Sequence, residues 1–218
     1  MKKTDMNLKD DIEQELRFDP KVNAAQIGVS VDKGAVMLTG EVNTNAAKWA
    51  VEDAVKRVGG VTVVAQELVV KLSGVHVHSD MEIAEAAVSA LRWDVWVPGS
   101  VKATVHQGRV CLEGRVGWKF QHDSAERAVR NLSGVVSVTN NICLEPDVQA
   151  DQVKEKIEAA LQRQAKTDAQ SIGVSASGGT VTLSGKAGSW HAIEGATSAA
   201  WAAPGVTNVI EKVLVSSF

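Results

Sequence analysis

The sequence predicts an α+β protein built from three tandem copies of one small domain, each running helix, strand, strand, helix, strand. The main observation is a set of glycines that recurs three times at spacings of six and twenty residues: Gly34, Gly40, Gly60, Gly108, Gly114, Gly134, Gly179, Gly185 and Gly205. The second is that a valine and a leucine stand four and two residues before the middle glycine of every set. Successive sets lie 74 and 71 residues apart, which is longer than the repeats of common solenoids. We therefore expect domains at residues 1–73, 76–147 and 148–218, each with a modest core of its own.

Each copy is expected to open with an amphipathic helix. In the first copy Leu8, Ile12 and Leu16 recur every four residues, so they share one face of a helix. Residue types that favour helix N-caps precede the three helices: Asp5 or Asn7, Ser79 or Asp80, and Asp151.

Two strands joined by a tight turn are expected next. Ile27, Val29 and Val31 alternate with other residues, which indicates a half-buried strand. The turn contains Gly34, whose freedom to take positive φ suits a hairpin. The second strand buries the valine and leucine of the motif, and Gly40 falls on the same inward side. A missing side chain there indicates that a helix packs closely or that a bulge bends the strand.

An alanine-rich helix and a third strand complete each copy. Small residues in this helix allow close packing on the sheet, and Gly60 is expected to end it as a left-handed cap. The third strand of the first copy passes through Val64, Leu68 and Val70. Two helices then cover one face of a three-stranded mixed sheet. The crossover makes the second and third strands parallel if they are adjacent, and pairing of the third strand with the first is the alternative.

The composition is that of an ordinary globular protein, and it excludes one class of partner. Of 218 residues, 44% are hydrophobic and 22% are charged, and the net charge is -3. No copy carries the excess of basic residues expected of a nucleic-acid binder, so no nucleic acid is expected as a partner. The N-terminus has two lysines but no apolar segment like that of a secretory signal, which predicts a cytoplasmic protein.

The motif resembles that of the BON domain, a family named after bacterial OsmY and nodulation proteins. The matching stretches are Val36–Val42, Val110–Val116 and Val181–Ala187, which read Val-x-Leu-x-Gly-x-Val except that alanine ends the third. The resemblance covers almost the whole chain. It implies a non-catalytic module that binds phospholipid or the cell envelope and is linked to osmotic or other stress. Many relatives are periplasmic or are lipoproteins, whereas this sequence shows neither a signal nor a lipobox cysteine and resembles a cytoplasmic, stress-associated branch.

No pattern of catalytic residues stands out, so no enzymatic activity, cofactor or metal is expected. His76 and His78 form an H-x-H pair between the first two copies, but no acidic or thiol partner has a spacing that suits a metal site. Cys111 and Cys143 fall on the outward side of two strands. A redox pair is one interpretation of these thiols, and small apolar packing residues are the favoured one.

Aromatic side chains near one end of the second copy form the first candidate binding surface: Trp93, Trp96, Trp118 and Phe120. Tryptophan is favoured at membrane interfaces and in binding hot spots, which indicates a lipid or partner surface. The alternative is that these rings plug the open end of a small core.

The outward face of the sheets is the second candidate. Its apolar residues are Met37, Val69, Cys111, Cys143 and Leu214. Because a solvated face is usually polar, we expect a neighbouring copy or another chain to cover it, and scattered surface apolar residues are the alternative.

The sequence leaves three functions open. The first is a binding module for phospholipid or envelope components. The second is a cytoplasmic scaffold that associates with itself as a homo-oligomer and has no lipid role. The third, an enzyme or redox protein centred on Cys111 and Cys143, has the least support.

Overall fold

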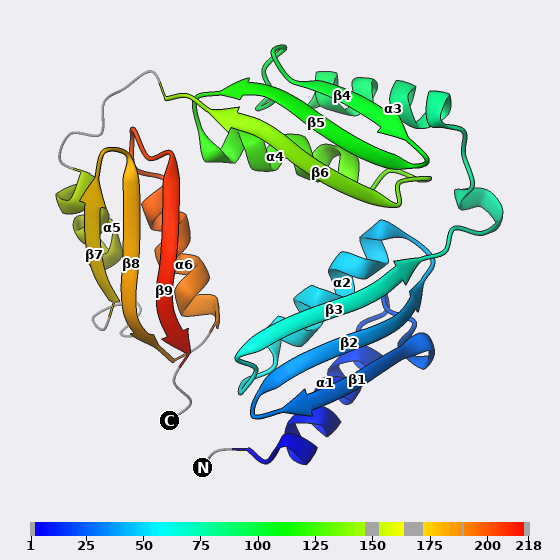
Figure 1. Ribbon diagram of the computed structural model, residues 1–218, viewed down its shortest axis with the longest axis horizontal. Helices are drawn as coiled ribbons and strands as arrows, with labels where there is room; N and C mark the ends of the chain where they lie inside the picture. The colour runs from blue at the N-terminus through cyan, green and yellow to red at the C-terminus, as the bar shows by residue number, and fades with distance from the viewer. Residues whose placement is uncertain (1–2, 147–152, 164–171, 189, 216–218) are drawn as a thin grey trace. The chain divides into compact units, whose positions relative to one another are not determined.

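The computed structural model describes residues 3–146, 153–163, 172–188 and 190–215 (Figure 1). The first copy consists of α1 (Asp5–Phe18), a 3-10 turn η1 (Ala24–Gln26), β1 (Ile27–Asp32), β2 (Ala35–Val42), α2 (Asn45–Arg57) and β3 (Val63–Val70). The second consists of η2 (Gly74–His76), α3 (Asp80–Trp93), β4 (Lys102–His106), β5 (Arg109–Val116), α4 (Lys119–Arg130) and β6 (Ser137–Leu144). The third consists of α5 (Val153–Arg163), β7 (Ile172–Ser177), β8 (Thr180–Ala187), α6 (Trp190–Trp201) and β9 (Asn208–Val215).

The second strand of each copy lies in the middle of its sheet. In the first copy β1 and β2 are antiparallel, with Ile27 opposite Gly40, and β2 and β3 are parallel, with Gly40 opposite Leu68. The third copy repeats this register, with Gly185 between Ile172 and Val213. The predicted α+β class and mixed sheets are therefore confirmed, and the third strand pairs with the second strand rather than with the first.

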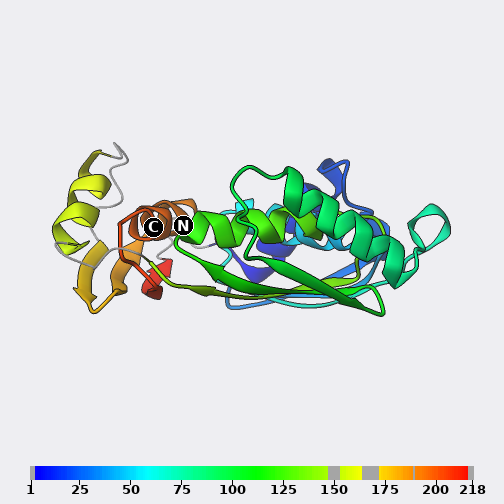
Figure 2. The same ribbon diagram turned by 90° about the horizontal axis from the view of Figure 1, so that it is seen from above.

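Both helices of a copy cover the same face of its sheet. In the first copy α1 packs on β1 and α2 packs on β3, and Figure 2 shows α3 and α4 above the sheet of the second copy. The predicted helix residues Leu8, Ile12 and Leu16 are buried against the strands, as are Val36 and Leu38 of β2.

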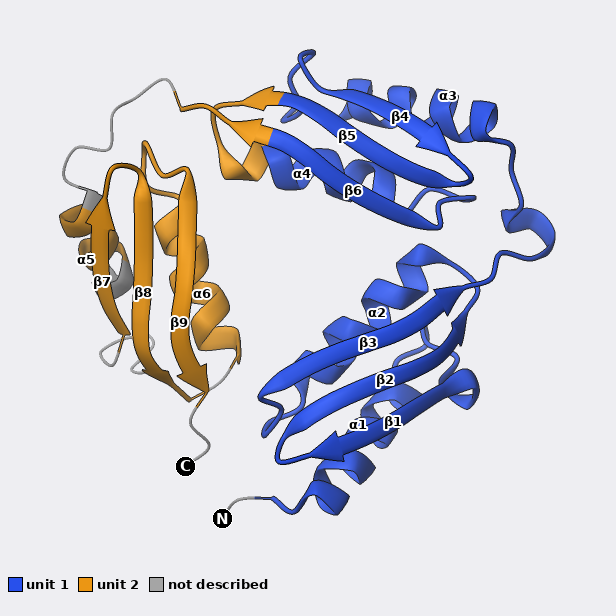
Figure 3. Ribbon diagram, viewed as in Figure 1, with its two compact units in different colours: residues 1–114, 122–142 blue, residues 115–121, 143–218 orange. Residues whose placement is uncertain are grey.

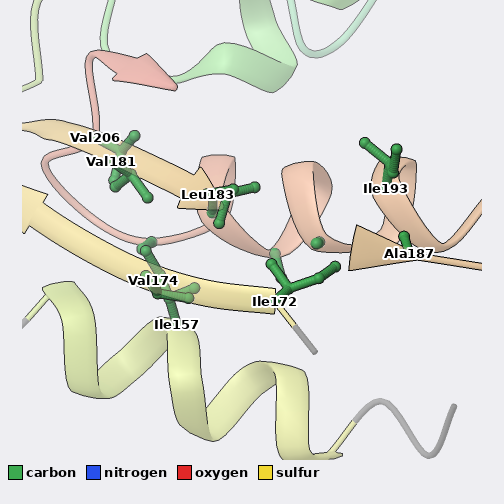
Figure 4. Close-up of a cluster of buried hydrophobic side chains, with 12 residues drawn as sticks. Ile157, Ile172, Val174, Val181, Leu183, Ala187, Ile193 and Val206 are labelled. Atoms are coloured by element: carbon green, nitrogen blue, oxygen red, sulfur yellow. The ribbon is translucent and has the colours of Figure 1, made fainter. Parts of the chain in front are cut away.

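The first and third copies each have a separate hydrophobic core. In the third copy Ile157 of α5 lies against Val174 of β7, and Leu183 of β8 belongs to the same buried cluster (Figure 4). The chain as a whole divides into two compact units, which are residues 1–114 with 122–142 and residues 115–121 with 143–218 (Figure 3).

The helix N-termini differ in part from the sequence prediction. Thr4, rather than Asp5 or Asn7, caps α1, because its hydroxyl accepts from the N–H of Asn7 at 3.3 Å. Ser79 caps α3 as predicted, in a capping box with Glu82. The predicted cap Asp151 lies outside the described residues.

The aspartates that follow these caps bind the hairpin turns instead. The carboxylate of Asp5 accepts from the backbone N–H groups of Lys33 and Gly34, at 2.8 and 3.2 Å. The carboxylate of Asp80 accepts from the N–H groups of Gln107 and Gly108, at 2.7 and 2.8 Å. The start of the first helix is thereby fixed to the tip of the hairpin in both copies.

All nine recurring glycines have positive φ. At Gly40, with φ at +121°, a Cβ atom would lie 2.0 Å from the carbonyl oxygen of Gln26. The close neighbour is thus the backbone just before β1, rather than the packed helix or bulge that the sequence indicates. Gly60 does not cap α2 directly, since the helix ends at Arg57 and Val58 occupies the C-cap position.

Candidate binding surfaces

The loop between α3 and β4 exposes large apolar side chains. Trp93, the last residue of α3, is 85% exposed, and Val95 and Trp96 are 86% and 58% exposed. These two tryptophans therefore do not plug the core of the second copy. The outer side of α3 continues this surface as a shallow, open depression, with Val88, Arg92 and Trp93 among its lining residues.

Turns inside this loop hold its shape. The carboxylate of Asp94 accepts from the N–H of Trp96 at 2.9 Å, and the carbonyl of Asp94 accepts from the N–H of Val97 at 3.2 Å. Asp94 also ends α3, since its N–H donates to Ala90. An aspartate that bonds the backbone two residues on fixes a local turn. The exposed rings therefore stand on an ordered loop.

Trp118 and Phe120 form a second aromatic pair, between β5 and α4. Both rings are exposed, and their centroids lie 6.3 Å apart. The side-chain oxygen of Gln121 accepts from the N–H groups of Gly117 and Trp118, both at 3.1 Å, which holds the chain at the start of α4. The role of these two rings in binding stays a prediction.

Phe18 is an exposed aromatic residue of the first copy, outside the candidate surface formed by the aromatic residues of the second copy. It ends α1 as Trp93 ends α3, and it is 83% exposed. The carboxylate of Asp19 then accepts from the N–H of Lys21 at 3.0 Å, in the same kind of turn as at Asp94. This hydrogen bond, followed by the one from Arg57, lowers the pKa of Asp19. The signal that reveals the repeat is an aromatic residue followed by aspartate two residues after the last buried leucine of the helix.

The predicted apolar positions on the outward face of the sheets differ in exposure. Val69 and Leu214 are more than half exposed within this chain, and Cys143 is also exposed. Met37 and Cys111 are half-buried. Coverage of this face by another chain stays a prediction.

The thiols and histidines have local partners. Cys111 and Cys143 form no disulfide bond, and the Sγ of Cys111 accepts a hydrogen bond from the side-chain amide of Asn141 at 3.4 Å. Nδ1 of His76 and Nε2 of His78 lie 3.2 and 3.1 Å from the hydroxyl oxygen of Ser133. These two contacts fasten the segment before α3 to the turn after α4.

Among the described residues, no three His, Cys, Asp or Glu side chains are grouped so that they would hold a metal ion. None of the helices described has both the length and the apolar character that crossing a bilayer requires.

Components of type III secretion systems are among the solved structures that align with the chain. CdsD, a structural protein of the system of Chlamydia trachomatis, aligns over 97% of this chain and 93% of its own, with 15% identity and a TM-score of 0.28. The periplasmic domain of the inner membrane protein PrgH from S. typhimurium aligns over 88% and 95%, with 14% identity and a TM-score of 0.24. TM-scores this low carry no argument about the function of this chain.

Comparison with models of protein families identifies the family of this chain. Comparison with curated proteins gave no match. The model of the BON domain matches residues 4–71, 79–146 and 149–217. Together these matches span nearly all of the sequence, and each contains one α-β-β-α-β copy. The chain belongs to the BON domain family and consists of three BON domains in tandem.

Proposed function

We propose that this protein is a non-catalytic binding module that attaches to phospholipid or envelope surfaces, through the loop between α3 and β4 of its second BON domain. The observation that carries the proposal is the exposure of Trp93, at the end of α3, and of Val95 and Trp96, on the short, ordered loop that follows. Exposing two tryptophans to water is unfavourable, and tryptophan is the residue most typical of membrane–water interfaces. The BON family assignment supports such a role, in osmotic or other stress.

The charge of the chain indicates how this binding is driven. A net charge of -3 provides no general attraction to anionic lipid, so insertion of apolar rings has to supply the free energy. Phe18 of the first BON domain ends its helix in the same way and adds a second point of insertion.

The test is co-sedimentation of the full chain with vesicles of neutral phosphatidylcholine and with vesicles that contain anionic phosphatidylglycerol, while tryptophan emission is followed. We expect binding with a blue shift, and a loss of affinity of roughly tenfold or more in the double variant Trp93→Ser, Trp96→Ser. Val75→Ser is the matched control, because Val75 is equally exposed but lies in η2. Equal binding by the double variant and the wild type would refute the proposed surface, and no binding to either vesicle would refute the lipid function.

A second function, a cytoplasmic scaffold that associates with itself, is favoured by the exposed apolar residues on the outward sheet faces. Val69 and Leu214 are more than half exposed there. If this face joins copies of the chain, sedimentation velocity will show a concentration-dependent oligomer that Val69→Ser and Leu214→Ser weaken. A monomer at all concentrations would rule this function out.

A further inference from the structure

The second helices of the three BON domains carry equivalent positions at their two ends. Asn45, Lys119 and Trp190 each follow the motif glycine by five residues and begin α2, α4 and α6. At the other end Lys56, Arg130 and Trp201 each precede the next recurring glycine by four residues. We call these the start position and the end position of the second helix.

Within the first compact unit, the start of α2 contacts the end of α4. Nδ2 of Asn45 donates to the backbone carbonyl of Arg130 at 3.0 Å. The guanidinium carbon of Arg130 lies 4.9 Å from the ring centroid of Trp49, one turn into α2. Asn45 is only 4% exposed, although it is polar. Burying an amide costs free energy unless the amide is hydrogen-bonded. The hydrogen bond to Arg130 therefore makes this contact specific for a partner that offers a carbonyl at that point.

The chemistry of the two helix ends is complementary. Arg130 is the last residue of α4, and the last carbonyl groups of a helix have no N–H partner within the helix. They need a hydrogen-bond donor from outside it. The amide of Asn45 supplies that donor. The guanidinium and the indole add a cation–π contact. Nε of Arg130 is buried and has no hydrogen-bond partner among the described atoms. The ring of Trp49 therefore provides a favourable contact for this buried part of the guanidinium.

Within the second compact unit, a start position again contacts an end position through a cation and a ring. Nζ of Lys119, at the start position of α4, lies 5.5 Å from the ring centroid of Trp201, at the end position of α6. Here the start position supplies the cation and the end position supplies the ring. In both units the first turns of one second helix contact the end position of another, although the residues that make the contact differ: Asn45 and Trp49 in the first unit, and Lys119 in the second.

We propose that the start of the second helix is a recognition surface for another BON domain, and that its partner is the end of the second helix in the following BON domain of this chain. The side chains encode the order. The end position of the second domain is a cation and fits the ring of Trp49, whereas the end position of the third is a ring and fits Lys119. Lys119 against Arg130 or Lys56 would bring two cations together, which is unfavourable.

Amide hydrogen exchange on the full chain tests the proposal through effects that cross from one domain to another. Arg130→Met, in the second domain, is expected to speed exchange in the first turns of α2 in the first domain by roughly threefold to thirtyfold, as the loss of a cation–π contact predicts. Trp49→Ala is expected to do the same to the last turn of α4. Arg127→Met is the matched control, because Arg127 lies on the same helix but is exposed.

Each outcome decides between recognition and a merely local role. A change confined to α4 in Arg130→Met would overturn the proposal, because it would show that the residue stabilises only its own helix. Should Trp49→Ala unfold the first domain, Asn45→Ala provides the same reading at the other side of the contact. In the second unit, Lys119→Gln is expected to speed exchange in the last turn of α6, and unchanged exchange there would limit the recognition surface to the first two domains.

Discussion

Asp80 at the start of α3 binds the backbone N–H of Gly108, 28 residues further along the chain, with an oxygen–nitrogen distance of 2.8 Å. Its other oxygen accepts from Gln107. One carboxylate thereby satisfies two N–H groups of a tight turn and ties the first helix to the hairpin. We expect Asp80→Asn to lower the thermal midpoint of the second BON domain by a few degrees, because one of the two hydrogen bonds and the negative charge are lost. Glu85→Gln is the control, since it removes the same charge from the exposed side of α3.

The same carboxylate gives the second domain a defined response to acid. Hydrogen bonds from Gly108 and then Gln107 lower the pKa of Asp80. Because the folded-state pKa lies below the unfolded-state value of about 4, this contribution is complete above that value and is lost as the pH falls through the folded-state pKa. Urea unfolding at a series of pH values is the measurement. The difference in stability between wild type and Asp80→Asn is expected to shrink below about pH 4, and a constant difference would contradict the assignment.

Substitution of Gly40 tests whether the stability of the first domain depends on the close approach of its backbone to Gln26. In Gly40→Ala the new methyl group would meet the carbonyl of Gln26 at a positive φ, so we expect a loss of about 2–4 kcal/mol from the first domain. Gly59→Ala is the matched control, because nothing lies within 4 Å of its Cβ position. Equilibrium denaturation compares the two variants. Equal stability of both would show that the backbone before β1 yields.

The thiols are expected to be dispensable. The double variant Cys111→Ser, Cys143→Ser retains a hydrogen-bond acceptor for Asn141, so unfolding free energy should change by no more than about 0.5 kcal/mol. Vesicle binding should also remain at the wild-type level. Loss of binding in this variant, or binding that responds to a reductant in the wild type, would revive the redox interpretation.

The order and class of the elements could be predicted because burial leaves a periodic signal. Val36 and Leu38 alternate with outward residues on β2, and Leu8, Ile12 and Leu16 recur at helical spacing. A short apolar run can belong to a helix or to a strand, and three copies of the same pattern in one register remove this ambiguity. Strand order could not be predicted, since a crossover from β2 reaches either neighbouring position without any change in the pattern.

The roles of single polar residues were harder to predict. The sequence indicates Asp5 or Asn7 as the cap of α1, whereas Thr4 is the cap and Asp5 binds the turn at Lys33 and Gly34. The usable signal was that an aspartate follows the cap in the first two copies. The contact between Asn45 and Arg130 left no such signal, because it joins residues 85 positions apart and depends on how two helix ends meet. Trp93 was selected for its residue type, but only the structure shows its exposure.

The separate cores of the first and third domains have a consequence for biosynthesis. Every core residue of the first domain, from Leu8 to Leu68, precedes every core residue of the third, from Ile157 to Val206. The first domain is therefore complete in the nascent chain while the third has not yet been translated. Domains generally fold as units during synthesis. We infer that the domains of this protein fold one after another as they leave the ribosome, so that the core residues of the first domain do not stay exposed until the third is made.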